Sequence, residues 1–230
     1  MKSLVFDTST IISLSTNDLL WVLKSLKDKF NGDFLISNGV KEELIDHPLQ
    51  TKKFKFEALN IISLINDNYL KIYSSKEISE KREYLDNLLN HMFKAKDEYI
   101  TIMHKGEIES LAVAIILNAN AYAVDERTTR MVIEDPERLA KILRNKLHTT
   151  ININKDNLNL FMKEVSNVKI IRSTELALIA YEDGIFKNLL KPNKYSSNVK
   201  KDLISGLLWG LRLRGCSISD EEINEALKIY

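Results

Sequence analysis

The chain has 230 residues, with 33 basic and 32 acidic side chains and a formal net charge of +1. Its length suits one large domain with a substantial core, and 44% hydrophobic residues is ordinary for a globular protein. A single cysteine, Cys216, excludes a disulfide framework and a cysteine-rich zinc site. The longest apolar run, 111–117, is too short to cross a membrane, and the N-terminal residues do not resemble a signal peptide. We therefore expect a soluble, cytoplasmic protein with no membrane partner.

Glycine-rich phosphate-binding loops are also excluded. The chain contains only 7 glycines and 3 prolines, and neither GxGxxG nor GxxxxGK[ST] occurs. The usual sequence basis for a dinucleotide site or a P-loop NTPase is therefore missing.

Short runs of β-branched and aromatic residues predict five strands separated by amphipathic segments. The predicted strands are 3–6, 33–36, 69–73, 121–124 and 169–171. The predicted helices are 17–30, 37–46, 54–65, 77–93, 106–118 and 173–183, and the second of them is expected to end before Pro48. This alternation predicts an α/β fold whose parallel sheet carries helices on both faces.

The C-terminal part of the chain is predicted to be helical throughout. A helix over 199–214 places Leu203, Leu207, Leu208 and Leu211 on one stripe. A capping box at 219–222 opens a last helix. We interpret 187–230 as a helical appendage to a domain spanning 1–186. The leucine stripe should be buried against that domain or against a second chain, as a homo-oligomer or through a protein partner.

Two candidate acids follow predicted strands directly. Asp7 comes after the strand 3–6, and Asp125 with Glu126 follows the strand 121–124. In open α/β sheets ligands bind beyond the carboxyl ends of the strands. The alternative for Asp7 is a cap on the next helix or turn, and polar loops after strands are common.

Two further candidate acids lie on helices. The first belongs to the pair Glu42 and Glu43, and the second is either Glu107 or Glu109 at the start of the apolar segment 106–118. A solvated glutamate is favoured at a helix start by the helix dipole. A carboxylate that heads a buried stripe, in contrast, needs a partner. Periodicity alone does not choose between Glu107 and Glu109.

Four segments occur in an order that resembles the PIN-domain family of α/β metal-dependent nucleases. They are LVFDTSTIISL at 4–14, VKEEL at 40–44, KGEIESLAVAI at 105–115 and AVDERTTR at 123–130. The segment VKIIRSTELALIAYEDG at 168–184 is similar to the last strand and helix of that domain. The resemblance covers roughly 1–184. It implies a PIN-like parallel sheet flanked by helices. Compared with the compact members of the family, the chain is expected to contain an added helical insertion at about 70–105.

The resemblance also implies a carboxylate cluster that holds Mg²⁺ or Mn²⁺ and cleaves single-stranded RNA. The catalytic acids of the family fall on Asp7, Glu43, Glu107 and Asp125. The implied metal ligands are Asp7, Glu107 and Asp125, with Glu126 as the adjacent alternative. Oxygen ligands without histidine or cysteine suit these two ions, which relieve the repulsion among converging carboxylates.

Hydroxyl and basic residues complete the expected site. Thr8 and Ser9 match the small hydroxyl residues that support the metal site in the family. Arg127 and Arg130 lie close enough to the fourth acid to meet a bound phosphate of the substrate. The partner implied is single-stranded or structured RNA.

The expected function is a divalent-metal-dependent endoribonuclease that works by hydrolysis. The alternative is a catalytically inactive PIN-like module that binds RNA or assembles with protein. A haloacid-dehalogenase-type phosphatase is less consistent with the sequence, because Ser9 stands where its second aspartate would be needed.

Overall fold

The computed structural model describes residues 2–230 and contains a five-stranded sheet in which all strands are parallel. In spatial order the strands are β3 (Lys71–Ile72), β2 (Asp33–Ile36), β1 (Ser3–Phe6), β6 (Ala121–Ala123) and β8 (Ile170–Ile171). The predicted α/β class is confirmed, and each of the five predicted strands is present. After β1 the chain adds β2 and β3 on one side of it, and later adds β6 and β8 on the other side. A topological switch point therefore lies between β1 and β6, where ligands bind in folds of this class.

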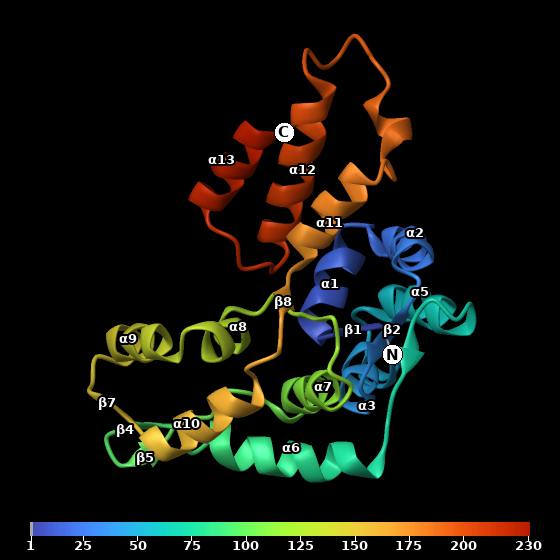
Figure 1. Cartoon of the computed structure of the whole chain (residues 1–230). Helices are drawn as coiled ribbons and strands as arrows, with labels where there is room; N and C mark the ends of the chain where they lie inside the picture. The colour runs from blue at the N-terminus through green and yellow to red at the C-terminus, as the bar shows by residue number, and fades with distance from the viewer. Residues whose placement is uncertain (1) are drawn as a thin grey trace.

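Helices cover both faces of the sheet because successive strand residues point to opposite sides. Val5 and Leu35 belong to the core on one face, while Phe6 and Phe34 belong to the core on the other. The first core is completed by α6 (Lys76–Leu89), α7 (Lys105–Ile116), α8 (Arg127–Glu134), α9 (Pro136–Leu147) and α10 (Lys155–Glu164). The second is completed by α1 (Thr8–Thr16), α2 (Leu20–Phe30), α5 (Lys55–Asn66) and α11 (Ser173–Glu182). Figure 1 shows this arrangement.

The helical segment after β2 runs further than its sequence predicts. It comprises α3 (Asn38–Lys41), a π-helical turn η1 (Glu42–Asp46) and α4 (His47–Gln50). The expected end before Pro48 is therefore wrong. Pro48 lies in the first turn of α4, where its missing N–H does not interrupt the helix. The π-helical turn contains both candidate glutamates of this segment, and such turns are frequent at functional sites.

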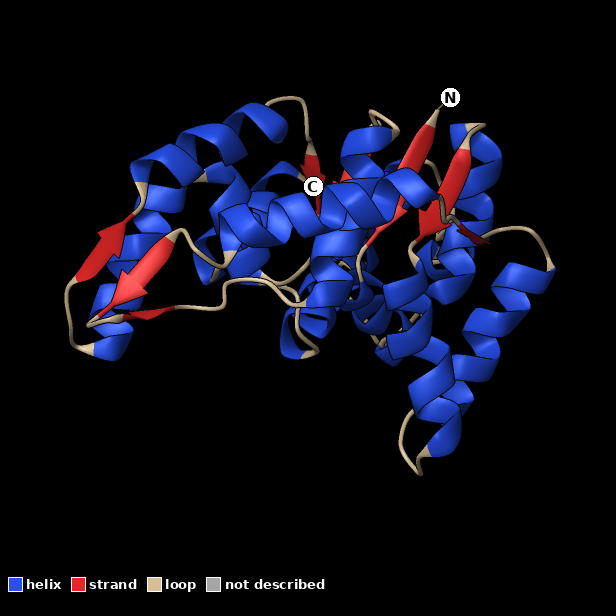
Figure 2. Cartoon of the chain, turned by 90° about the horizontal axis from the view of Figure 1, so that it is seen from below, coloured by secondary structure: helices blue, strands red, loops and turns tan. Residues whose placement is uncertain are grey.

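A second, antiparallel sheet was not predicted. It consists of β5 (Glu98–Tyr99), β4 (Phe93–Ala95) and β7 (Ile151–Ile153), in that order. The segment 70–105 is thus only partly helical, and α6 ends at Leu89 because Phe93 already pairs with Ile153. Figure 2 shows these three strands at one end of the molecule, apart from the parallel sheet.

The C-terminal residues pack on the rest of the chain. After a short 3₁₀ turn, η2 (Lys187–Leu190), α12 (Val199–Leu213) and α13 (Asp220–Ile229) lie beside α11 in Figure 1. Leu208 and Leu211 are fully buried, and Leu203 and Leu207 are half-buried. The leucine stripe is therefore covered largely by the chain itself. No helix within residues 2–230 has the length and apolar character needed to cross a bilayer.

Candidate functional site

Asp7 and Asp125 lie next to each other at the carboxyl ends of β1 and β6. The backbone N–H of Asp7 donates to the carbonyl of Ala123 at 2.9 Å, which extends the pairing of the two strands. The hydroxyl of Ser9 donates to Asp7 Oδ2 at 2.6 Å and accepts from the N–H of Asp125 at 3.0 Å. Ser9 therefore connects the two strand ends at the switch point.

Asp7 uses only one of its carboxylate oxygens in the fold. Oδ2 accepts from the N–H of Ser9 at 3.0 Å and caps α1, as the structural alternative predicted. Oδ1 is buried and finds no hydrogen-bond donor among the described residues. The pKa of Asp7 is raised from 3.8 to about 7, mainly by burial and in smaller part by the charges of Glu107 and Glu43, against the lowering effect of the hydrogen bonds from Ser9. Asp7 is thus a carboxylate with an unsatisfied oxygen and two acidic neighbours.

Glu43 reaches the site from the π-helical turn. Its Oε2 accepts from the hydroxyl of Thr8 at 2.5 Å. Its Oε1 lies where a side chain on Gly106 would be, because a Cβ there would be 2.5 Å from this oxygen. Glu42 is exposed and makes no such contact. Glu43 is therefore the member of the pair that lies at the site.

Two facing glycines, Gly39 on α3 and Gly106 on α7, let these two helices approach closely. A Cβ on Gly39 would lie 2.9 Å from the Cα of Gly106 and 3.0 Å from a carboxylate oxygen of Glu109. Glu109 therefore packs against α3, whereas Glu107 points toward the strand ends. The sequence pattern left this choice open. These two glycines are the sequence feature that indicates the position of Glu43 beside α7, and the motif pattern did not reveal it.

Glu107 and Glu126 are linked through Thr129 of α8. Glu107 Oε2 accepts from the N–H of His104 at 2.7 Å and so caps α7, while Oε1 accepts from the Thr129 hydroxyl at 3.0 Å. Glu126 Oε2 accepts from the N–H of Thr129 at 2.6 Å. Burial raises the pKa of Glu107, and the charge of Glu126 adds to this effect. Glu126 is thus the acid of the 125–126 pair that faces Glu107.

Asp125 has a different environment from the other three expected acids. It is fully buried, and Ser173 donates its N–H to Oδ1 at 2.7 Å and its hydroxyl to Oδ2 at 2.6 Å. The hydroxyl of Thr10 is a further donor at 3.5 Å, and the Asp125 carbonyl accepts from the N–H of Ser217. The side chain therefore ties β6 to the start of α11. Its role as a metal ligand stays a prediction. To bind a metal ion, the carboxylate would have to give up its hydrogen bonds to Ser173.

The donor set and the unsatisfied Asp7 oxygen fit a hard divalent cation. Oxygen ligands suit Mg²⁺ or Mn²⁺, and a cation would favour the charged form of Asp7, whose pKa is raised by burial and by the neighbouring acids. The side chains are not gathered around a single point, since residues 2–230 contain no group of three or more histidine, cysteine, aspartate or glutamate residues arranged as a metal site. Glu43 and Glu107 are instead held by the hydroxyls of Thr8 and Thr129, which an ion would replace.

The two arginines expected to contact substrate differ in their surroundings. Arg127 is exposed at the first position of α8. Arg130 is half-buried, and its Nη1 donates to the carbonyl of Ser217 at 3.0 Å. Arg127 is therefore the more available of the two for an external anion.

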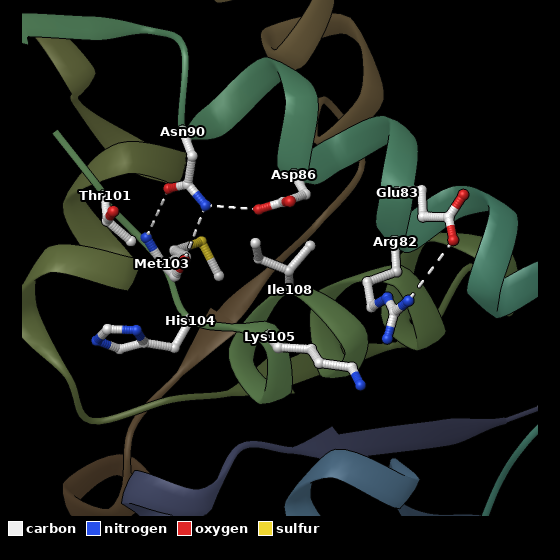
Figure 3. A pocket seen from close by; sticks show the side chains of 9 residues that line it. All are labelled: Arg82, Glu83, Asp86, Asn90, Thr101, Met103, His104, Lys105 and Ile108. Carbon is white, nitrogen blue, oxygen red and sulfur yellow. Dashed lines mark hydrogen bonds and ion pairs between the residues drawn. The ribbon is translucent and has the colours of Figure 1, made fainter. Parts of the chain in front are cut away.

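A separate pocket of about 280 Å³ adjoins the site where the chain enters α7. Figure 3 shows Arg82, Asp86, Asn90 and His104 among its lining side chains. Asn90 donates to Asp86 at 2.6 Å and to the carbonyl of Met103 at 3.1 Å, so these polar groups are satisfied within the fold. The pocket lies beside the carboxylates and does not contain them.

Comparison of the chain with protein-family models, curated proteins and solved structures finds no match. The likeness to PIN-domain proteins therefore rests on the four motifs and on the parallel sheet that carries them.

Proposed function

We propose that the chain is a PIN-like endoribonuclease that depends on a divalent metal ion. The observation that supports this proposal best is the state of Asp7. Its Oδ1 is buried without a donor at the switch point of the sheet, and burial together with the charges of Glu107 and Glu43 raises its pKa. A purely structural carboxylate would be expected to have both oxygens satisfied, as Asp125 does.

Asp7 and Glu107 are the residues proposed to hold Mg²⁺ or Mn²⁺. The third acid would be Glu126, which lies beside Glu107, or Asp125 after it exchanges its bonds to Ser173. When bound, the ion would supply positive charge that polarises a phosphodiester and lowers the pKa of a bound water.

The residues of the chain would orient the carboxylates. Ser9 holds Asp7 Oδ2, and Oδ1 is left without a hydrogen-bond partner within residues 2–230. Thr129 holds one oxygen of Glu107 in the same way. Glu43 is the solvent-exposed acid of the cluster, and the hydroxyl of Thr8 orients its carboxylate. Without a cation, Asp7 would be partly protonated near neutral pH, because its pKa is about 7.

The alternative proposal is a PIN-like module that binds RNA or assembles with protein and does not catalyse. The observation in its favour is that no three acidic side chains of residues 2–230 are arranged around a common ion position. If this alternative holds, RNA binding should survive chelation of divalent ions and no cleavage should appear.

The experiment is cleavage of an end-labelled, unstructured RNA with Mn²⁺, with Mg²⁺ or with EDTA. The wild type should cleave with either ion and not with EDTA. Asp7→Asn keeps the size of the side chain and removes its charge, so cleavage should fall by about 100-fold or more. Glu109→Gln is the matched control, because Glu109 lies on the same helix as Glu107 but packs against Gly39. Wild-type cleavage by Asp7→Asn, or full cleavage in EDTA, would rule out the proposed mechanism.

A further inference from the structure

A cleft lined by arginines separates α8 and α9 from the corner that joins α12 to α13. Its volume is about 570 Å³. One wall includes Arg127, Arg130 and Arg138, and the other includes Arg212 and Ser217. The cleft thus combines side chains from the sheet domain with side chains from the C-terminal helices.

Two of these arginines are engaged within the fold. Arg212 forms an ion pair with Asp220. Arg130 donates from Nη1 to the carbonyl of Ser217 at 3.0 Å, and Glu134 lies 3.8 Å from its Nε. The Nε–H of Arg130 is buried and finds no hydrogen-bond acceptor among the described residues. One guanidinium donor inside the cleft is therefore unsatisfied.

The other two arginines carry uncompensated charge. Arg127 and Arg138 are both exposed, and no carboxylate of residues 2–230 lies within ion-pairing distance of either. Guanidinium groups bind phosphate oxygens through paired N–H donors. The cleft therefore presents two free cations and one unsatisfied donor to an external anion.

Two of the acidic residues of the cleft are already occupied. Glu222 accepts from Arg172 at 2.8 Å, and hydrogen bonds from Ser219 and Arg172 lower its pKa against the effect of burial. Asp135 caps α9 by accepting from the N–H of Arg138 at 3.0 Å. Glu134 is exposed at the rim beside Arg130. The lining therefore holds four arginines and three acids, so a small positive excess remains.

The start of α8 contributes side chains both to the cleft and to the carboxylate site. Glu126 and Thr129 of this turn contact the site, since Thr129 bonds to both Glu126 and Glu107. Arg127 and Arg130 of the same turn line the cleft. One helical turn rises about 5.4 Å, so an anion held in the cleft would begin close to the acids.

We infer that this arginine cleft binds the phosphodiester backbone of a single-stranded nucleic acid, with Arg127 and Arg138 contacting its phosphates. The identity of the polyanion rests on the proposed function. The cleft gives the C-terminal helices a role, because the α12–α13 corner forms one wall of the substrate path. That corner is fixed to the site by the bond from the Ser217 N–H to the Asp125 carbonyl.

The test is fluorescence anisotropy of a labelled, unstructured RNA of about 12 nucleotides in EDTA, so that no cleavage occurs. Arg127→Gln and Arg138→Gln should each weaken binding by about fivefold or more, and each should reduce the slope of log affinity against log salt by about 0.7. Arg144→Gln is the matched control, because this exposed arginine lies on α9 outside the cleft. Arg144→Gln should reduce both the RNA affinity and the salt slope by less than either cleft variant does.

The results separate this inference from the proposed nuclease activity. Binding that depends on Arg127 and Arg138, without any cleavage in Mn²⁺, would support the cleft and overturn the nuclease proposal. Cleavage by the wild type, with both cleft variants binding and cleaving like Arg144→Gln, would overturn the cleft and leave the nuclease proposal standing. Failure of the wild type to bind RNA would overturn the cleft inference directly.

Discussion

Replacing Asp7 by asparagine should stabilise the metal-free protein, and the gain should increase with pH. The pKa of Asp7 is about 7 in the folded protein, against an ordinary value of 3.8. Because the folded-state value is the higher one, folding favours the protonated acid. The stabilising contribution of the acid is fully present below 3.8 and is lost as the pH rises through about 7. Asparagine does not titrate, so Asp7→Asn should escape this loss.

The magnitude follows from the interval between the two pKa values. At about 1.4 kcal/mol for each pH unit, the interval from 3.8 to about 7 corresponds to about 4 kcal/mol at alkaline pH. A little more than a third of this is already present near pH 5, so the stability difference should grow by about 3 kcal/mol between about pH 5 and about pH 8. In a domain of this size that growth corresponds to about 6–12 °C in Tm.

The assay is urea denaturation of the wild type and Asp7→Asn in EDTA at both pH values. The change in the difference between the two proteins is the useful quantity, because any effect of the amide on packing cancels. Asp97→Asn is the control, since the side chain of Asp97 is fully exposed and should give no such change. A difference between wild type and Asp7→Asn that is constant within about 0.5 kcal/mol would refute the reasoning. Millimolar Mn²⁺ should stabilise the wild type and leave Asp7→Asn unchanged.

Three further predictions concern other parts of the site and the core. Gly106→Ala should displace the Glu43 carboxylate and reduce cleavage by up to about 100-fold. The free energy of unfolding should not fall, because alanine favours helix. Cleavage at the wild-type rate would contradict this prediction. Asp125→Asn should destabilise the fold by about 1–3 kcal/mol, the opposite direction to Asp7→Asn, because buried charge-assisted bonds are lost; a gain in a urea melt would show the assignment to be wrong. Leu211→Ala should cost about 2–5 kcal/mol, whereas Leu213→Ala, at a site 78% exposed, should cost little; equal losses would contradict the packing described for α12.

The parallel sheet was predictable because its two longest strands each contain a run of three apolar residues after a polar first residue. Asp33–Ile36 and Ser3–Phe6 match their predicted bounds, and a strand buried on both faces requires such a run. The antiparallel sheet was not predictable, because Glu98–Tyr99 contains two residues, both exposed. A strand of two residues is too short to show an alternation of apolar and polar side chains. The sheet is completed by β7, which pairs with the other edge of β4 although it lies more than fifty residues further along the chain.

The candidate site was predictable in its residue types and less so in its geometry. A carboxylate after an apolar strand could be assigned to the edge of the sheet, as for Asp7. The direction in which a side chain leaves a loop depends on neighbours distant in sequence, however. Asp125 turns toward Ser173, 48 positions away, while the adjacent Glu126 faces Glu107. The unsatisfied oxygen of Asp7 is likewise a property of packing that no sequence pattern expresses.

The most direct test of the central claim is a crystal of the protein soaked in Mn²⁺ and measured for anomalous scattering. The account predicts an anomalous peak about 2 Å from Asp7 Oδ1, with a carboxylate oxygen of Glu107 in the same coordination shell. The same peak should be missing in crystals of Asp7→Asn. A crystal that binds Mn²⁺ only at other acids, or a peak that persists unchanged in Asp7→Asn, would contradict the assignment of Asp7 as the metal ligand.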